Sequence, residues 1–282
     1  MSASLPPIAG LVITFNEADR IGECLRSMQP VCRQLLVLDA GSTDGTADAA
    51  RRAGAQVVTC DWQGFTRQRN RALELAKYPW ALFLDADERL SGDLVREILA
   101  IFNASSDGEA QLADLDGFDM RFRTRFLGKA LRFGASTREH HVRLFRTTLR
   151  YRQRRVHEHL LFDPRRVRML SGRVLHDTAR DYAHYQGKLA RYATLLAVDR
   201  AEAGRQSSLG KAWIRAGFFW LKNYWIRAGF LDGYAGYLYH RLHAEYVFGK
   251  HARLWEHNVR ASCVRTRGVS RPQSAEPNAG TR

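Results

Sequence analysis

Two aspartates separated by one residue are the strongest candidates for chemistry in this sequence. Asp85 and Asp87 directly follow the short apolar run 80–84. A run of this length predicts a buried strand, so both carboxylates would stand where the chain leaves a sheet, the edge at which open α/β folds bind ligands. Two hard oxygen ligands on one turn suit Mg²⁺ or Mn²⁺, and a metal held in this way usually also binds a substrate phosphate. The same pair also fits a solvated acidic turn, so the choice between a metal site and a turn depends on the other motifs of the chain.

Strand-like and helix-like segments alternate through the first hundred residues. The expected strands are 8–14, 34–38, 56–59 and 80–84, and the expected helices are 17–28, 44–53, 66–77 and 94–102. Such alternation with short connections predicts an α/β fold in which helices flank a mostly parallel sheet.

Three polar clusters fall at the ends of predicted strands. They contain, in chain order, Thr14, Asn16 and Glu17; Asp39, Ser42 and Asp44; and Asp85 and Asp87. Each cluster alone could be a turn or a helix cap, and residues 39–46 are no EF-hand because no glutamate follows at the bidentate position. Their convergence on one rim predicts a ligand site.

These motifs resemble those of the family 2 glycosyltransferases, which have the GT-A fold. The likeness rests on residues 13–17, 39–46, 69–70 and 85–88 and covers about residues 8–180. Residues 156–158 and 229–233 are similar to a narrower bacterial branch that contains the lipopolysaccharide inner-core β-1,4-glucosyltransferases. Ala40 stands where many members have Asp or Ser, and we do not expect that side chain to be essential.

The resemblance implies an inverting transferase that moves a hexose, glucose, from a UDP-sugar to a lipopolysaccharide inner-core heptose. The implied nucleotide-sugar ligands are Thr14, Asn16, Glu17, Asp39, Ser42, Asp44, Arg69, Asn70 and Asp85. Arg69, expected in the first turn of its helix, suits a diphosphate through its forked guanidinium. The divalent metal, Mg²⁺ or Mn²⁺, would bind Asp87 and Asp85, with His176 as an additional ligand.

An inverting displacement needs one general base for the acceptor hydroxyl. The candidates are Glu139, Glu158, Asp163 and Asp177. We select Glu158, which stands among arginines after the metal motif. His157 is the candidate to orient it or to contact a phosphate, although a lone histidine more often has a packing role. The alternative is that Glu158 only forms a salt bridge to a neighbouring arginine.

The net charge of +15 is concentrated in the middle of the chain. Between Arg121 and Arg173 there are sixteen Lys and Arg against three acidic residues, which predicts an anionic partner. Residues 121–126 alternate arginine with aromatic residues, as in a half-buried strand with one basic face, and a nucleic-acid surface could look similar. Because no nucleic-acid motif accompanies them, we expect a lipid-linked anionic glycan acceptor and no nucleic acid.

The C-terminal third predicts helices at a membrane surface. Lys211, Arg215 and Lys222 recur at helical spacing among the aromatic residues of 211–230, the pattern of an interfacial helix, although a helix packed on the catalytic domain would also fit. A second helix is expected over 231–255 after a break at 229–233. The expected domains are a GT-A domain 1–180 (donor half 1–103, acceptor half 104–180), a helical extension 181–265 and a disordered tail 266–282.

The cysteines and the N-terminus predict a cytoplasmic protein, and the C-terminal pattern adds peripheral attachment to the inner membrane. The four cysteines lack C-x-x-C spacing, residues 1–7 lack the basic and apolar regions of a signal peptide, and no uncharged apolar run reaches 18 residues. Other possibilities are transfer to polyprenyl phosphate or another envelope glycan, a non-catalytic basic nucleotide-binding module, and a nucleotidyltransferase. The last would need a glycine- and lysine-rich phosphate loop after the first strand, which residues 14–17 do not provide.

Overall fold

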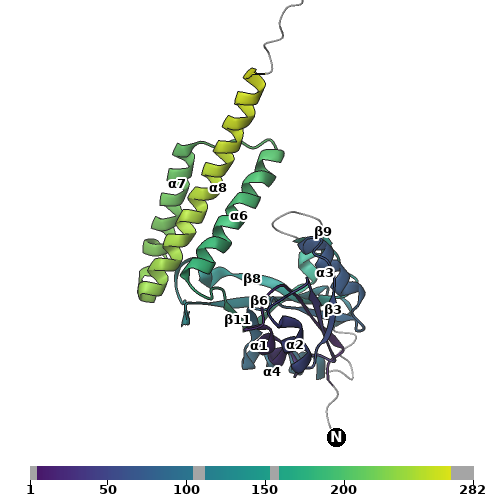
Figure 1. Cartoon of the computed structure of the whole chain (residues 1–282). Coiled ribbons are helices and arrows are strands. Elements are labelled where there is room, and N and C mark those ends of the chain that lie inside the picture. The colour runs from purple at the N-terminus through teal and green to yellow at the C-terminus, as the bar shows by residue number, and fades with distance from the viewer. Residues whose placement is uncertain (1–4, 104–111, 153–158, 268–282) are drawn as a thin grey trace, which may run out of the picture.

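The structure, a computed structural model, describes residues 5–103, 112–152 and 159–267. They form a mixed α/β domain built on a large curled sheet, from which a group of long helices projects (Figure 1). The expected α/β class with a C-terminal helical extension is confirmed.

The N-terminal half of the sheet is parallel. Its strands are β1 (Ile8–Thr14), β2 (Gln34–Asp39), β3 (Gln56–Thr59) and β4 (Trp80–Phe83), in the spatial order β3-β2-β1-β4. The connecting helices are α1 (Ile21–Met28), α2 (Thr46–Arg52) and α3 (Phe65–Glu74). All pairs within this half are parallel, so the carboxyl ends of these strands share one rim, as the alternating pattern predicted.

Helix α1 begins at Ile21, later than the predicted start at residue 17. Asn16 has a left-handed φ of 57°, and the backbone N–H groups of Asn16 and Glu17 donate to the side chains of Ser42 and Thr46. These residues therefore belong to a structured loop between β1 and α1.

The second half of the sheet is mixed. It contains β5 (Glu88–Leu90), β6 (Gly117–Phe126), β7 (Lys129–Ala130), β8 (His140–Arg146) and β11 (Val167–Asp177), and α4 (Gly92–Asn103) packs beside β11. The order continues from β4 through β8, β6 and β11 to β5, with β8 antiparallel to both β4 and β6. β9 (Tyr151–Arg152) and β10 (His159–Leu160) form a separate small sheet. On β6, Arg121 and Arg123 are exposed while Phe122 and Phe126 are buried, which confirms the half-buried strand with a basic face.

Both faces of the parallel half are covered, which explains its nearly continuous apolar strands. On β1, Ile8 and Val12 join one core cluster, whereas Ala9 and Leu11 join the cluster on the opposite face. Successive side chains of a strand point to opposite faces, so a strand buried on both sides has no polar alternation.

The helical extension consists of α6 (Tyr182–Glu202), α7 (Leu209–Trp220) and α8 (Gly233–Arg267), with α8 lying between the other two (Figure 1). A π-helical turn, η3 (Leu221–Ile226), and a 3-10 turn, η4 (Gly229–Asp232), separate α7 from α8, at the predicted break. α8 continues to Arg267, beyond the expected end at 255, and the remaining residues of the expected tail lie outside the described part. No described helix is both long and apolar enough to cross a membrane.

Asp232 attaches the extension to the sheet. Its carboxylate is buried and accepts hydrogen bonds from the backbone N–H groups of Arg132 (3.0 Å) and Phe133 (3.0 Å). In addition, Phe126 of β6 packs with Tyr185 of α6 and Tyr239 of α8. The extension is thus packed on the mixed half of the sheet through both polar and aromatic contacts.

Candidate functional site

The loops that follow β1 and β2 are joined by side-chain-to-backbone hydrogen bonds. The Asn16 N–H donates to the Ser42 hydroxyl at 2.8 Å, and the Glu17 N–H donates to the Thr46 hydroxyl at 2.8 Å. In return, the Asn16 side-chain oxygen accepts from the Thr43 N–H at 3.0 Å. Two of the three predicted polar clusters therefore form one rigid loop pair on the rim.

Asp39 and Asp44 shape this loop pair. Asp39 is only 2% exposed, and its carboxylate accepts from the backbone N–H (2.9 Å) and the hydroxyl of Ser42. Asp44 accepts from the N–H groups of Thr46 (3.0 Å) and Ala18 (3.1 Å). Both carboxylates fix the backbone of the loops that follow β1 and β2.

Asp85, at the end of β4, is held by two arginines. Arg69 of α3 donates to one carboxylate oxygen at 2.8 Å and Arg143 of β8 donates to the other at 3.0 Å. Arg143 also pairs with the buried Glu88, whose second oxygen accepts from the Asp85 N–H at 3.0 Å. Burial raises the pKa of Asp85, but Arg69 and Arg143 more than offset this and hold it well below its usual range.

Asp87 faces three cationic side chains from separate parts of the chain. Its Oδ2 lies 3.4 Å from His176 Nε2 on β11, 3.5 Å from Lys188 Nζ on α6 and 3.8 Å from an Arg20 guanidinium nitrogen. Burial would raise the pKa of Asp87, but His176 and Lys188 lower it to about 2. The carboxylate is therefore ionised and lies in a strongly cationic surrounding.

Glu139 lies on the other side of His176. Its carboxylate is 3.8 Å from His176 Nδ1 and 3.5 Å from His141 Nε2, and it accepts from the Thr124 hydroxyl at 3.2 Å. At 3.8 Å the Glu139 carboxylate is too far for a hydrogen bond to His176 Nδ1, so its effect on the ring is electrostatic. His176 is thus held between Glu139 and Asp87.

The four candidates for the general base have different positions. Glu158, with His157, lies outside the described residues. Asp163 caps the 3-10 turn η2 (Pro164–Arg166) ahead of β11, roughly 30 Å of strand away from His176. Asp177 points to the opposite face of β11 from His176 and pairs with Arg89 and Arg125. Among the described candidates, Glu139 is the one beside the carboxylate cluster.

Arg69 and Asn70 lie in the second turn of α3, whereas the sequence placed them in the first. Arg69 points to Asp85, as described above. The Asn70 amide donates to the carbonyl of Tyr151 at 3.0 Å and accepts from its N–H at 2.8 Å. Asn70 therefore holds β9 against α3.

Several residues of the cluster were not singled out from the sequence. Glu88 directly follows the aspartate pair, so its position in the motif was the available signal. Arg20, Arg143 and Lys188 carry no local signal, because their contacts with Asp85 and Asp87 arise from the packing of distant segments.

A divalent cation can be fitted to part of the predicted ligand set. Among the described residues, no three His, Cys, Asp or Glu side chains are arranged to hold a metal ion, and the oxygens of Asp85 face arginines. Asp87 and His176 face each other and offer an oxygen and a nitrogen, ligand types that Mn²⁺ accepts. This pair fits a cation that would complete its coordination with phosphate and water.

Comparison with known proteins identifies the family. A family model described as Glycosyl transferase family 2 matches residues 11–171, more than half of the chain. The chain belongs to this family. The matched segment of this family 2 glycosyltransferase contains Asp39, Asp85 and Asp87 and ends before α6.

Relatives of this family 2 enzyme differ in how much of the chain they share. Lipopolysaccharide core biosynthesis glycosyltransferase LpsC of Rhizobium meliloti (strain 1021) is 27% identical over 267 residues, which cover 90% of this chain and 96% of LpsC. An uncharacterized glycosyltransferase of Rickettsia bellii (strain RML369-C) is 40% identical over 106 residues, 38% of this chain and 36% of that protein. The likeness to LpsC thus reaches beyond the segment of the family model into the helical extension.

Solved structures match a smaller part of the chain. Glucosyl-3-phosphoglycerate synthase from Mycobacterium tuberculosis, in complex with Mn²⁺, UDP and glucosyl-3-phosphoglycerate, matches with a TM-score of 0.32 and 22% identity, over 44% of this chain and 45% of that chain. The chain therefore spans less than half of that enzyme and of the Rickettsia bellii protein.

Proposed function

We propose that the protein is an inverting, metal-dependent glycosyltransferase that moves glucose from UDP-glucose to a heptose of the lipopolysaccharide inner core. The observation that carries the proposal is the position of Asp87, ionised among His176, Lys188 and Arg20 at the rim of the parallel sheet. A site with this charge distribution suits a diphosphate and its cation. The likeness to LpsC over nearly its whole length supports a lipopolysaccharide core acceptor.

The donor would lie across the two joined loops and the end of β4. We assign the nucleoside to the surface formed around Thr14, Asn16, Glu17, Asp39, Ser42 and Asp44. Lys188 and Arg20 would face the diphosphate. Arg69 would either bind the diphosphate or keep its ion pair with Asp85. Asp87 and His176 would hold the cation, which when bound offsets the charge that develops on the leaving diphosphate.

The transfer is a single displacement in this proposal. The acceptor oxygen forms a bond to the anomeric carbon while the bond between that carbon and the diphosphate oxygen breaks, and the electron pair leaves with UDP. The acceptor proton passes to a carboxylate, which we assign to Glu158 with His157 orienting it. Glu139 positions His176 and does not take this proton.

The basic surface and the extension would bring the enzyme to its acceptor. Arg121 and Arg123 are exposed on β6 and suit an anionic, lipid-linked glycan. We place the protein in the cytoplasm, attached peripherally to the inner-membrane surface, where lipids supply negative charge.

The test combines donor binding with product formation. The full chain is heated with Mn²⁺ and UDP-glucose, UDP-galactose, UDP-N-acetylglucosamine or GDP-mannose, and UDP-glucose should raise Tm most. It is then incubated with UDP-glucose and heptose-terminated inner-core lipopolysaccharide, and mass spectrometry should detect one added hexose. A failure of all uridine nucleotides to stabilise the protein would refute the donor assignment. Stabilisation without transfer to heptose, but with transfer to polyprenyl phosphate, would refute the acceptor.

A further inference from the structure

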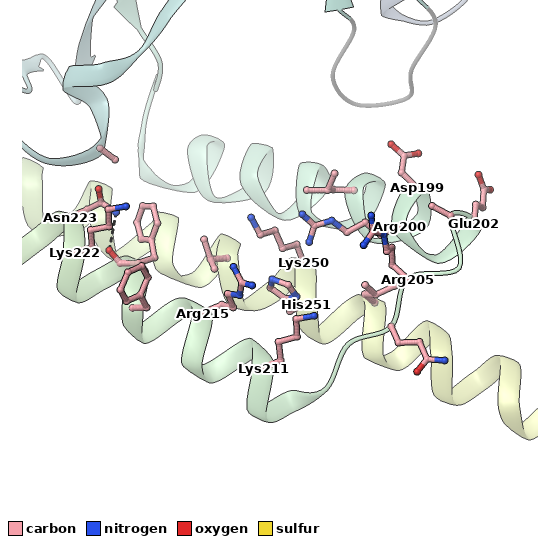
Figure 2. A pocket seen from close by; sticks show the side chains of 18 of the residues that line it. Asp199, Arg200, Glu202, Arg205, Lys211, Arg215, Lys222, Asn223, Lys250 and His251 are labelled. Atoms are coloured by element: carbon pink, nitrogen blue, oxygen red, sulfur yellow. Dashed lines mark hydrogen bonds between the residues drawn. The ribbon is translucent and has the colours of Figure 1, made fainter.

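A basic groove opens between the three long helices of the extension (Figure 2). Its volume is about 1090 Å³, and its walls come from α6, α7, η3 and α8. Seven of the lining side chains are cationic: Arg200, Arg205, Lys211, Arg215, Lys222, Arg227 and Lys250. Lys211, Arg215 and Lys250 gather in the middle of the groove with His251.

The protein itself does little to neutralise these cations. Within the described ranges, none of the seven forms an ion pair with a carboxylate, and Arg227 donates to the Asn223 side-chain oxygen at 2.9 Å. Two acidic residues, Asp199 and Glu202, also line the groove. Burial and the nearby Arg200 and Arg215 lower the pKa of Lys250. Like charges gathered in a part-buried groove favour the binding of an anion.

An exposed apolar stripe adjoins the groove on α7 and η3. Ile214, Phe218, Leu221 and Trp225 are spaced four, three and four residues apart and are 73%, 59%, 51% and 57% exposed. This spacing places them on one helical face, next to the face of Lys211, Arg215 and Lys222. Phe218 lines the groove as well, so the stripe and the basic face meet there.

We propose that the groove binds the phosphate of an anionic lipid headgroup while the adjoining stripe enters the bilayer interface. Interfacial helices place aromatic and aliphatic residues among the lipids and Lys or Arg at the headgroups. A soluble phosphate or a nucleic acid would use the cations but would leave the stripe in water. The combination of a cationic hollow with an exposed apolar border therefore favours a lipid phosphate.

α6 connects this groove to the candidate site. Lys188 contacts Asp87, and Arg200 lines the groove. The helix between them is about 18 Å long, at 1.5 Å per residue. A lipid held in the groove would fix the distance between the bilayer surface and Asp87. The proposal concerns lipid binding alone, so it does not depend on the assigned donor or acceptor.

Vesicle flotation tests the proposal without sugar nucleotide or acceptor. The full chain is mixed with vesicles of phosphatidylcholine alone or with phosphatidylglycerol, at fixed salt. We expect binding to the anionic vesicles only, and a loss of about tenfold or more in the double variant Arg215→Gln/Lys250→Gln. The matched control, Arg52→Gln/Lys77→Gln, removes the same charges from exposed positions on the parallel half and should bind as the unmodified protein does.

Additional variants and competitors distinguish a lipid phosphate from other anionic ligands. Lys211→Gln, at an exposed position, repeats the test if the double variant fails to fold, and Phe218→Ser should weaken vesicle binding without lowering Tm. Inorganic phosphate and a single-stranded RNA oligonucleotide are added as competitors. Equal losses in the groove and control variants would overturn the proposal in favour of a net-charge effect. RNA binding that is lost in the groove variants, while vesicle binding is kept, would overturn it in favour of nucleic acid.

Discussion

The ammonium group of Lys188 lies 3.5 Å from the carboxylate of Asp87 and joins the helical extension to the candidate site. Asp87 follows β4 in the parallel half, whereas Lys188 comes from α6, beyond the segment that the family model matches. The extension thus contributes a cation to the diphosphate end of the proposed site.

Replacement of Lys188 should weaken transfer without unfolding the protein. Lys188→Met removes a positive charge that would face the leaving diphosphate, and we expect kcat/KM for UDP-glucose to fall roughly tenfold to a hundredfold. Lys188→Arg should recover part of the loss because the charge is kept. Steady-state kinetics with Lys77→Met as a surface control measure this effect, and an unchanged kcat/KM in Lys188→Met would contradict the assigned role.

Glu158→Gln and Glu139→Gln should have different effects. Glu158→Gln should abolish transfer and leave the Tm increase with UDP-glucose intact, because a base acts on the acceptor and not on donor binding. Glu139→Gln should retain transfer but require more Mn²⁺, since a negative charge 3.8 Å from His176 is lost beside the cation site. A metal titration of both variants distinguishes the two roles. Transfer that persists in Glu158→Gln would mean that another carboxylate is the base.

The pairing of Arg143 with Glu88 should contribute strongly to stability. Arg143→Met leaves Glu88 buried without its cationic partner and should lower the free energy of unfolding by about 3–5 kcal/mol. The double variant Arg143→Met/Glu88→Gln should lose less than the sum of the single changes, because no buried charge is then left unpaired at Glu88. Urea unfolding of the two single variants and the double variant at neutral pH measures this double-mutant cycle. Losses in free energy of unfolding that simply add would argue against the pairing.

Gly134 should tolerate no side chain. Its φ is +78°, and an added Cβ would lie 2.1 Å from Nε2 of the buried His240. Gly128 has the same φ of +78° but nothing within 4 Å of an added Cβ, so Gly128→Ala is a matched control for backbone strain. We expect Gly128→Ala to cost about 1 kcal/mol and Gly134→Ala to lower Tm considerably further. Equal Tm values for the two variants would contradict the close packing of His240.

Acid should destabilise the extension through its buried histidines. Burial, with a smaller contribution from His240, lowers the pKa of His243 to about 4. The unfolded chain, with an ordinary histidine pKa near 6.5, takes up the proton first, so stability is lost as the pH falls from about 6.5 towards 4. One such histidine contributes a slope of at most about 1.4 kcal/mol per pH unit. Denaturation between pH 7.5 and 5.5 should show a smaller slope in His243→Gln, and an unchanged slope would contradict the shift.

Local pattern was sufficient to predict the strands of the parallel half and the rim where the polar clusters meet. β3 lies at the predicted residues 56–59, and β4 begins at the predicted residue 80. Strands buried on both faces are recognisable in the sequence as short, nearly continuous apolar runs. Parallel pairing then brings the residues after Thr14, Asp39 and Phe83 to one edge of the sheet. The place of Asp85 and Asp87 could therefore be predicted from neighbouring residues alone.

The partners of these carboxylates were decided by tertiary structure. Arg143 reaches Asp85 because β8 pairs antiparallel with β4, and Lys188 reaches Asp87 because α6 packs against the rim. Neither side chain is marked by its sequence neighbours, since one arginine in a basic segment resembles the next. The sequence by itself determined where the negative charges stand and that basic helices follow them. Only packing over long sequence separations decided which cations face those charges, and that seven cations of the extension line one groove.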